Sequence, residues 1–180
     1  MKKLSILIAF TLLLSGCTSK SKLDGGGVLP GCDQIRVGVA SDKTLKLPCL
    51  DGSTSIGFHQ IKGPIVINVW GSWCEGCRKE MPYFVDLYST QSFKSGQIQL
   101  LGVNVEENSP TAGPDYIKQS GMSWPHLNDL NNQTKAIFGP GVPVTWFIDS
   151  EGAVVEKHIG AYQNRQQLFS QVEKAFGITL

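Results

Sequence analysis

The sequence lacks the features that mark several common classes of protein. Its 180 residues carry a formal net charge of only +1, and no stripe of lysine or arginine offers an electrostatic footprint for nucleic acid. Its longest apolar run is shorter than the roughly 20 residues that a membrane-spanning helix needs. No internal repeat is present. Hydrophobic residues make up 41% and charged residues 17%, which is typical of one globular domain with a leader segment.

Residue types that bind metals are also scarce. Cys74 and Cys77 form the only closely spaced pair of cysteines, whereas a structural zinc site needs four ligands, usually from two such pairs or from added histidines. The three histidines, His59, His126 and His158, are scattered and are expected to be surface or packing residues. The sequence therefore predicts no metal site.

The N-terminus has the pattern of a secretion signal. Lys2 and Lys3 precede an apolar run over residues 4–14, which has the length of a signal-peptide core. Residues 14–17, Leu-Ser-Gly-Cys, resemble the lipobox of bacterial lipoproteins, in which the cysteine becomes the lipidated first residue. We therefore expect residues 1–17 to be a lipoprotein signal peptide and Cys17 to attach the protein to the outer face of the bacterial cytoplasmic membrane. The alternative is an ordinary signal peptide with a chance cysteine.

A low-complexity stretch separates this signal from the domain. Residues 18–31 are rich in serine, lysine and glycine, with three glycines at 25–27, and predict a flexible tether. We assign 18–44 to a tether or N-terminal extension and 45–180 to the folded domain.

The five cysteines divide into three roles. With Cys17 lipidated and Cys74 paired with Cys77, Cys32 and Cys49 remain as a candidate structural disulfide, which export would allow to persist. Such a bridge would attach the extension to the domain. Two free thiols are the alternative.

Hydrophobic periodicity and turn residues predict an α/β fold with a central mixed sheet flanked by helices. The run at 64–70 is rich in β-branched residues and almost wholly apolar, as in a central strand buried on both faces. The other predicted strands are 45–62 (with a loop), 98–105, 124–127, 144–149 and 153–159, and the predicted helices are 74–90, 114–120, 132–138 and 164–176, the last capped by Asn164.

Cys74 and Cys77 lie where the buried strand gives way to a helix. A thiolate on Cys74 would sit over the unpaired N–H groups of the first helical turn, where the helix dipole is positive, and Cys77 follows one turn later. This placement predicts a redox pair, with Cys74 as the nucleophile and Cys77 as the resolving thiol. Attachment of c-type haem is excluded because Arg78, and not histidine, follows Cys77.

Two stretches carry a resemblance to a known family. Residues 69–82 are similar to the active-site segment of the thioredoxin-like lipoproteins related to TlpA and ResA, and residues 141–149 are similar to their second signature. The resemblance covers about residue 45 to the C-terminus. It implies a thioredoxin-like fold with an inserted β/α segment and thiol–disulfide exchange through the cysteine pair, without a cofactor. Gly76 replaces the proline usual in the family, so the reduction potential is left open.

The resemblance also implies roles for residues around the pair. The peptide bond before Pro143 is expected to be cis and to offer the Val142 backbone to an extended substrate segment. Trp73 is expected to lie exposed as a docking surface, with simple packing as the alternative. Glu80 is expected to be buried near the sulfurs and to shuttle the Cys77 proton, with a solvated glutamate as the alternative.

Three further residues are expected to tune the redox pair. Asn68 stands where cytoplasmic thioredoxins carry a buried acid, which moves the proton-shuttle role toward Glu80. Glu75 places a negative charge beside Cys74 and should favour a better reductant, while Gly76 alters the dipeptide between the sulfurs.

These features predict a membrane-tethered, extracytoplasmic thiol–disulfide oxidoreductase. The resemblance favours a reductant of client disulfides, for example on apocytochrome c during cytochrome c biogenesis, recharged by a membrane thiol conduit. The alternatives are an oxidase that installs disulfides in secreted proteins and a copper-delivery lipoprotein on the same fold, which would need a third ligand near the pair. A peroxidase is disfavoured because no Pro/Thr-bearing loop precedes Cys74.

Overall fold

The computed structural model describes residues 25–39 and 45–180. The signal peptide, Cys17 and residues 18–24 of the tether lie outside the described residues. Within the described part of the chain, no helix combines the length and the apolar character needed to cross a membrane.

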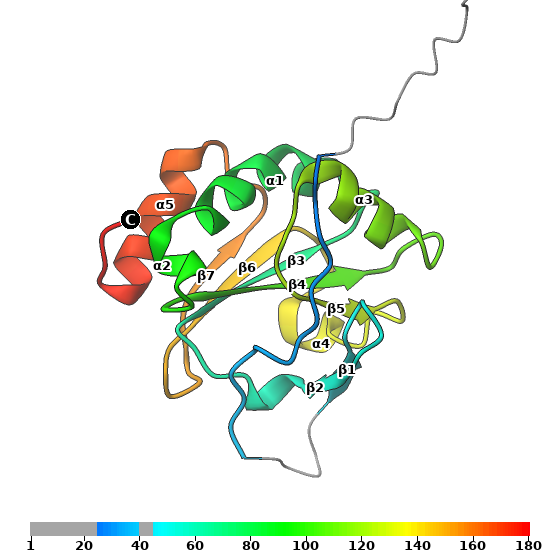
Figure 1. Ribbon diagram of the computed structural model, residues 1–180, viewed down its shortest axis with the longest axis horizontal. Coiled ribbons are helices and arrows are strands. Elements are labelled where there is room, and N and C mark those ends of the chain that lie inside the picture. The colour runs from blue at the N-terminus through cyan, green and yellow to red at the C-terminus, as the bar shows by residue number, and fades with distance from the viewer. Residues whose placement is uncertain (1–24, 40–44) are drawn as a thin grey trace, which may run out of the picture.

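A five-stranded mixed sheet forms the centre of the domain, with the strand order β5-β4-β3-β6-β7 (Figure 1). Strands β3 (Ile65–Trp70), β4 (Gln99–Val105) and β5 (His126–Asp129) run parallel, and β6 (Val144–Ile148) and β7 (Val154–Ile159) are antiparallel to their neighbours. This confirms the predicted thioredoxin-like α/β fold and its mixed sheet.

Helices α1 (Glu75–Tyr88), α3 (Ala112–Ser120) and α5 (Arg165–Phe176) cover one face of the sheet (Figure 1). The short helix α2 (Gln91–Lys94) follows α1 and was not predicted, because four residues are too few to show a helical period. Asn164 caps α5 as predicted: its side-chain oxygen accepts a hydrogen bond from the N–H of Gln167.

The opposite face carries smaller elements: the hairpin β1 (Lys46–Pro48) and β2 (Ser55–Gly57), a single 3-10 turn η1 (Phe58–Gln60) and helix α4 (Lys135–Phe138).

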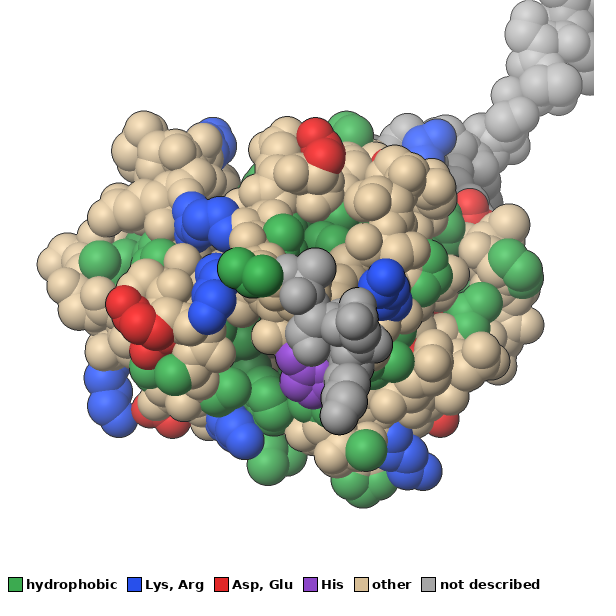
Figure 2. All heavy atoms as spheres, turned by 90° about the horizontal axis from the view of Figure 1, so that it is seen from below, with side chains coloured by type: hydrophobic (Ala, Val, Ile, Leu, Met, Phe, Trp, Pro, Cys, Tyr) green, Lys and Arg blue, Asp and Glu red, His purple; other side chains and the backbone are tan. Residues whose placement is uncertain are grey.

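On the side of the molecule shown in Figure 2, the lysine and arginine side chains of the described residues are dispersed among neutral ones and form no continuous basic patch.

Strand β3 is buried on both faces because both faces are covered. Val66 and Trp70 join the core beneath the helices, whereas Ile65, Ile67 and Val69 join the core beneath the β1–β2 hairpin. Alternation along the strand thus divides its side chains between two cores, and this explains why the sequence shows an apolar run that only Asn68 interrupts. The end of β3 is therefore held rigidly where the cysteine pair follows.

The N-terminal extension is packed and not loose where the structure describes it. The N–H of Gly27 donates to the carbonyl of Lys118 at 3.2 Å, and that of Val28 donates to Met122 at 2.8 Å. A side chain at position 27 would collide with the carbonyl of Ile117. The glycines that suggested flexibility thus permit a close approach of two backbones, and residues 25–31 differ in this from the predicted tether.

Cys32 and Cys49 form the disulfide that the cysteine count predicted, with Cα atoms 6.0 Å apart. Each cysteine is 2% exposed, and the Cys32 sulfur lies 3.6 Å from the carbonyl oxygen of His126. The bridge joins the extension to the residue that follows β1. Its burial makes it a structural crosslink and not a second redox pair.

Replacing both Cys32 and Cys49 with alanine should lower the free energy of unfolding by roughly 3 kcal/mol, because a crosslink spanning 17 positions restricts the unfolded chain. Urea unfolding of the double variant and of the unaltered protein would measure this. Thiol–disulfide exchange by the folded double variant should be unchanged. An equal unfolding midpoint in both proteins would show that the bridge contributes no stability.

Candidate active site

The cysteine pair lies at the start of α1, directly after the loop that ends β3. Cys74 is the N-cap of the helix: its N–H donates to the carbonyl of Gly71 at 3.1 Å, and its sulfur accepts from the N–H of Cys77 at 3.0 Å. The two residues are disulfide-bonded, with Cα atoms 5.3 Å apart. The first sulfur is therefore placed where free N–H groups of the helix can stabilise a thiolate.

The two cysteines differ in access to solvent. Cys74 keeps 6% of its surface exposed, whereas Cys77 is fully buried. A partner can therefore approach Cys74 but not Cys77. This asymmetry supports Cys74 as the nucleophile and Cys77 as the resolving thiol.

A buried hydrogen bond fixes the end of β3 ahead of this loop. The indole N–H of Trp70 donates to Nδ1 of His126 at 3.2 Å, above Gly102 of β4, where a Cβ would collide with both rings. Burial lowers the pKa of His126 to about 3, so the ring is neutral. His126 is thus a packing residue, one of the two roles expected for the histidines.

Glu80 is fully buried, so the solvated-glutamate alternative is wrong. One carboxylate oxygen accepts from the side-chain amide of Asn68 at 3.0 Å, and the other accepts from the backbone N–H of Tyr162 at 2.9 Å. Burial raises the pKa of Glu80 to about 7, although these two hydrogen bonds act to lower it. A carboxyl group one helical turn beyond Cys77 can therefore gain or lose a proton near neutral pH.

The neighbours of Glu80 come from distant parts of the chain. Asn68 is buried on β3 and also donates to the hydroxyl of Thr145 on β6 at 3.3 Å. The ring of Tyr162 stacks on His158 with centroids 4.0 Å apart. Thr145 and Tyr162 were missed by the sequence analysis, because a threonine in a strand and a tyrosine in a loop carry no pattern that links them to a glutamate.

Glu75 and Gly76, the two residues between the cysteines, lie at the surface of α1. Glu75 forms a salt bridge of 2.8 Å with Lys79, which lowers the pKa of the Glu75 carboxyl. The ammonium group therefore balances part of the negative charge that was expected to tune the pair. A Cβ on Gly76 would lie 3.4 Å from Pro143 and from Ala161, so a small side chain at this position would pack against both residues.

Two exposed apolar side chains, those of Trp73 and Ile159, form what we call the apolar rim: Trp73 directly precedes Cys74, and Ile159 directly precedes Gly160, which bonds to Pro143. The Val142–Pro143 peptide bond is cis, as expected from the resemblance, and the carbonyl of Pro143 accepts from the N–H of Gly160 at 3.0 Å. Trp73 is 46% exposed, which favours the docking role over simple packing, and Ile159 is 81% exposed. Ile159 was missed, because an apolar residue in a strand predicts a core position and only the sheet order places β7 at the edge.

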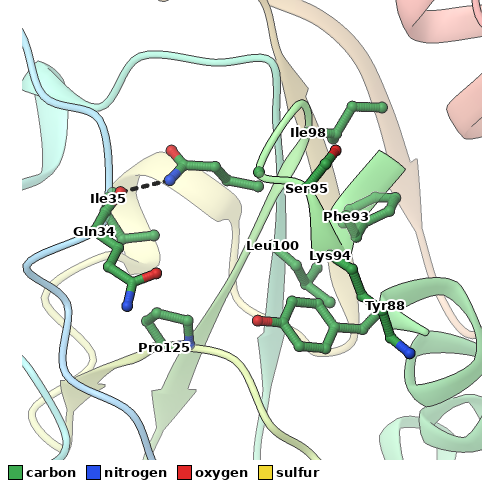
Figure 3. Close-up of a pocket in the computed structure, with 11 residues that line it drawn as sticks. Gln34, Ile35, Tyr88, Phe93, Lys94, Ser95, Ile98, Leu100 and Pro125 are labelled. Carbon is green, nitrogen blue, oxygen red and sulfur yellow. Dashed lines mark hydrogen bonds between the residues drawn. The ribbon is translucent and has the colours of Figure 1, made fainter. Parts of the chain in front are cut away.

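A pocket of about 190 Å³ lies at the other end of the sheet from the cysteine pair (Figure 3). Its walls include Tyr88 and Leu100, and Gln99 donates from its side chain to the carbonyl of Gln34 beside it. Leu100 is near the start of β4, whereas Cys74 follows the end of the parallel strand β3. The pocket is therefore remote from the cysteines and does not belong to their site.

Residues 25–39 and 45–180 contain no cluster of three or more His, Cys, Asp or Glu side chains that could hold a metal ion.

The fold and the cysteine pair define a class, the thioredoxin-fold thiol–disulfide oxidoreductases, which react through cysteine sulfur without an added cofactor. Residues 39–157 match the AhpC/TSA family. The thiol–disulfide oxidoreductase ResA of Bacillus anthracis is 30% identical over 173 residues, which cover 95% of this chain and 90% of that protein. The ResA of Bacillus subtilis is 35% identical over 56% of each chain. The chain therefore belongs to the AhpC/TSA family, among the ResA-type thiol–disulfide oxidoreductases.

Solved structures share the fold at lower identity. A secreted disulfide oxidoreductase of Mycobacterium tuberculosis, homologous to Escherichia coli DsbE, superimposes with a TM-score of 0.63 at 17% identity, covering 74% of this chain and 99% of that one. The exposed lipoprotein thioredoxin Etrx1 of Streptococcus pneumoniae superimposes with a TM-score of 0.57 at 22% identity, covering 73% and 98%.

Proposed function

We propose that this protein is a membrane-tethered, extracytoplasmic reductant of protein disulfides. The observation that carries the proposal is the partly accessible Cys74 at the start of α1, with Cys77 buried behind it and Glu80 buried one turn further on. The ResA relatives support the chemistry.

The proposed reaction has two exchange steps. The Cys74 thiolate attacks one sulfur of a client disulfide, forming a bond between Cys74 and the client while the other client sulfur leaves as a thiolate and takes a proton. Cys77 then gives its proton to Glu80 and attacks the Cys74 sulfur. The Cys74–Cys77 disulfide forms, the second client thiol is released, and two electrons have passed to the client.

The apolar rim is proposed to bind an extended client segment. The backbone of Val142, before the cis bond, would pair with the client strand, while Trp73 and Ile159 would contact its side chains on either side. Apocytochrome c, whose cysteines must be reduced during cytochrome c biogenesis, is the client class that we favour. A membrane thiol conduit would return the pair to its dithiol form.

The location is proposed from the N-terminal sequence. Residues 1–17 would direct export, and Cys17 would carry the lipid that holds the domain at the outer face of the cytoplasmic membrane. The names of two structural neighbours, one secreted and one an exposed lipoprotein, agree with this location. Fatty-acid labelling of the expressed full-length chain would test it: an unlabelled mature protein would rule out the anchor.

The reduction potential tests the direction of electron flow. Carboxylates near a cysteine pair disfavour the thiolate and hence stabilise the disulfide, so we expect a value near that of thioredoxin, about −270 mV, or below. Equilibration of the Cys74–Cys77 pair with glutathione redox buffers, read by trapping with a thiol reagent, would give the value. A potential near about −120 mV would instead identify an oxidase, the alternative that the Gly76 substitution leaves open.

A further inference from the structure

A second carboxylate, that of Glu107, is joined to the loop that carries the nucleophile. One oxygen of Glu107 accepts from the backbone N–H of Ser72 at 2.7 Å, and the other accepts from the Ser72 hydroxyl at 2.5 Å. The side-chain amide of Asn104 also donates to Glu107, at 2.6 Å. Three donors therefore converge on one side chain, and hydrogen bonds to a charged acceptor are the stronger kind.

The loop is held from its other side as well. The carbonyl of Ser72 accepts from the guanidinium of Arg78 on α1 at 3.2 Å, and that guanidinium lies over the ring of Tyr116. The indole N–H of Trp73 points to the carbonyl of Val105, the last residue of β4, at 3.4 Å. Ser72 is thus fixed between a carboxylate and a cation.

This bracing acts on the reacting sulfur. Ser72 lies two residues before Cys74, within the turn that the hydrogen bond from the N–H of Cys74 to the carbonyl of Gly71 closes. A shift of Ser72 would therefore move the Cys74 sulfur relative to the N–H groups of the first helical turn, which stabilise its thiolate.

The negative charge of Glu107, unlike that of Glu75, has no lysine or arginine paired with it in a salt bridge among the described residues. Glu75 is paired with Lys79. Arg78 and the buried Glu80 are the other charged groups that α1 contributes to this end of the fold. A carboxylate that holds the nucleophile loop without a cation partner disfavours a nearby thiolate.

We infer that Glu107 is a positioning residue for the exchange reaction: it holds the loop that carries Cys74, and its charge makes the cysteine pair a stronger reductant. The inference deepens the proposed function and rests on it. It assigns to the loop after β4 a role that neither the spacing of the cysteines nor the family signatures indicated.

The test compares Glu107→Gln, which keeps the shape and can still accept from Ser72, with Glu106→Gln, which removes the same charge from the exposed residue before it. Two properties would be measured: the pH at which the iodoacetamide reaction of Cys74 is half-maximal, and the ratio of dithiol to disulfide in a fixed glutathione buffer. For Glu107→Gln we expect the half-maximal pH to fall by about half a unit to one unit, and the ratio to rise about threefold to tenfold. Glu106→Gln should change both by less.

A third variant, Glu107→Ala, separates position from charge. It removes all three hydrogen bonds, and we expect kcat/KM for a disulfide substrate to fall about tenfold when compared at pH values that give equal thiolate fractions. If this variant does not fold, Glu107→Gln alone decides. The inference would be overturned if Glu107→Gln and the unaltered protein had the same half-maximal pH and the same ratio of dithiol to disulfide. It would also be overturned if Glu106→Gln shifted these two properties as much as Glu107→Gln does. Failure of the unaltered protein to exchange with glutathione would instead overturn the proposed function.

Discussion

Replacing Cys77 with alanine should convert the protein into a trap for its clients. Cys74 would still attack a client disulfide, but no second sulfur would lie one helical turn away to release the product, so the mixed disulfide should persist. We expect turnover with a model disulfide substrate to fall by at least about a thousandfold, while stoichiometric adducts accumulate. Non-reducing gel electrophoresis and intact mass would detect the adduct.

The matched variant Cys74→Ala controls for this result. It removes the accessible sulfur and leaves Cys77, which is fully buried, so it should form no adduct and show no turnover. Adducts on Cys74→Ala in amounts equal to those on Cys77→Ala would show that the two roles are assigned wrongly.

On the proposed mechanism, replacing Glu80 with glutamine should slow exchange by about a hundredfold at neutral pH, because the Cys77 thiol would lose the carboxylate that accepts its proton. In the unaltered protein, burial raises the pKa of Glu80 to about 7, so the rate of resolution should change across this pH. The variant should lose that inflection. Stopped-flow measurement of mixed-disulfide resolution between about pH 5 and 9 would show the difference, and an unchanged profile would remove Glu80 from the mechanism.

The same residue should give the stability of the oxidised protein a distinct pH dependence. Between the ordinary value of 4.5 and about 7, the folded state keeps a proton on Glu80 that the unfolded state has lost. Stability should therefore be highest below this window and should fall as pH rises through it, by about 3 kcal/mol in total. Glu80→Gln should flatten this part of the curve in urea unfolding. Glu151→Gln, at the exposed turn between β6 and β7, is the control that should retain it.

Several parts of the active site are determined locally and could be predicted. The apolar run of β3, the glycine that ends it and two cysteines three residues apart specify a buried strand, a turn and a helix start from neighbouring residues alone. The cap of α5 by Asn164 is equally local. Resemblance to a family added the cis bond before Pro143 and the burial of Glu80.

Other parts depend on pairing between distant segments. Residues 25–31 were expected to be a tether, yet Gly27 packs against α3, because three glycines in a row are compatible with close packing as well as with flexibility. Ile159 reads as a core residue until the sheet order places its strand at an edge.

By itself, the sequence determined the chemistry of this protein: two thiols at the spacing of one helical turn, after a strand that must be buried, behind a segment with the pattern of an export signal. Only the tertiary structure decided which distant groups bond to the residues around it. The Glu80 carboxylate accepts a hydrogen bond from the backbone N–H of Tyr162, 82 positions away in the sequence. The Glu107 carboxylate accepts one from the backbone N–H of Ser72, 35 positions away. Local patterns encode the period and the ends of each element, whereas these contacts arise only when the strands pair in one register and bring remote loops to the same end of the sheet.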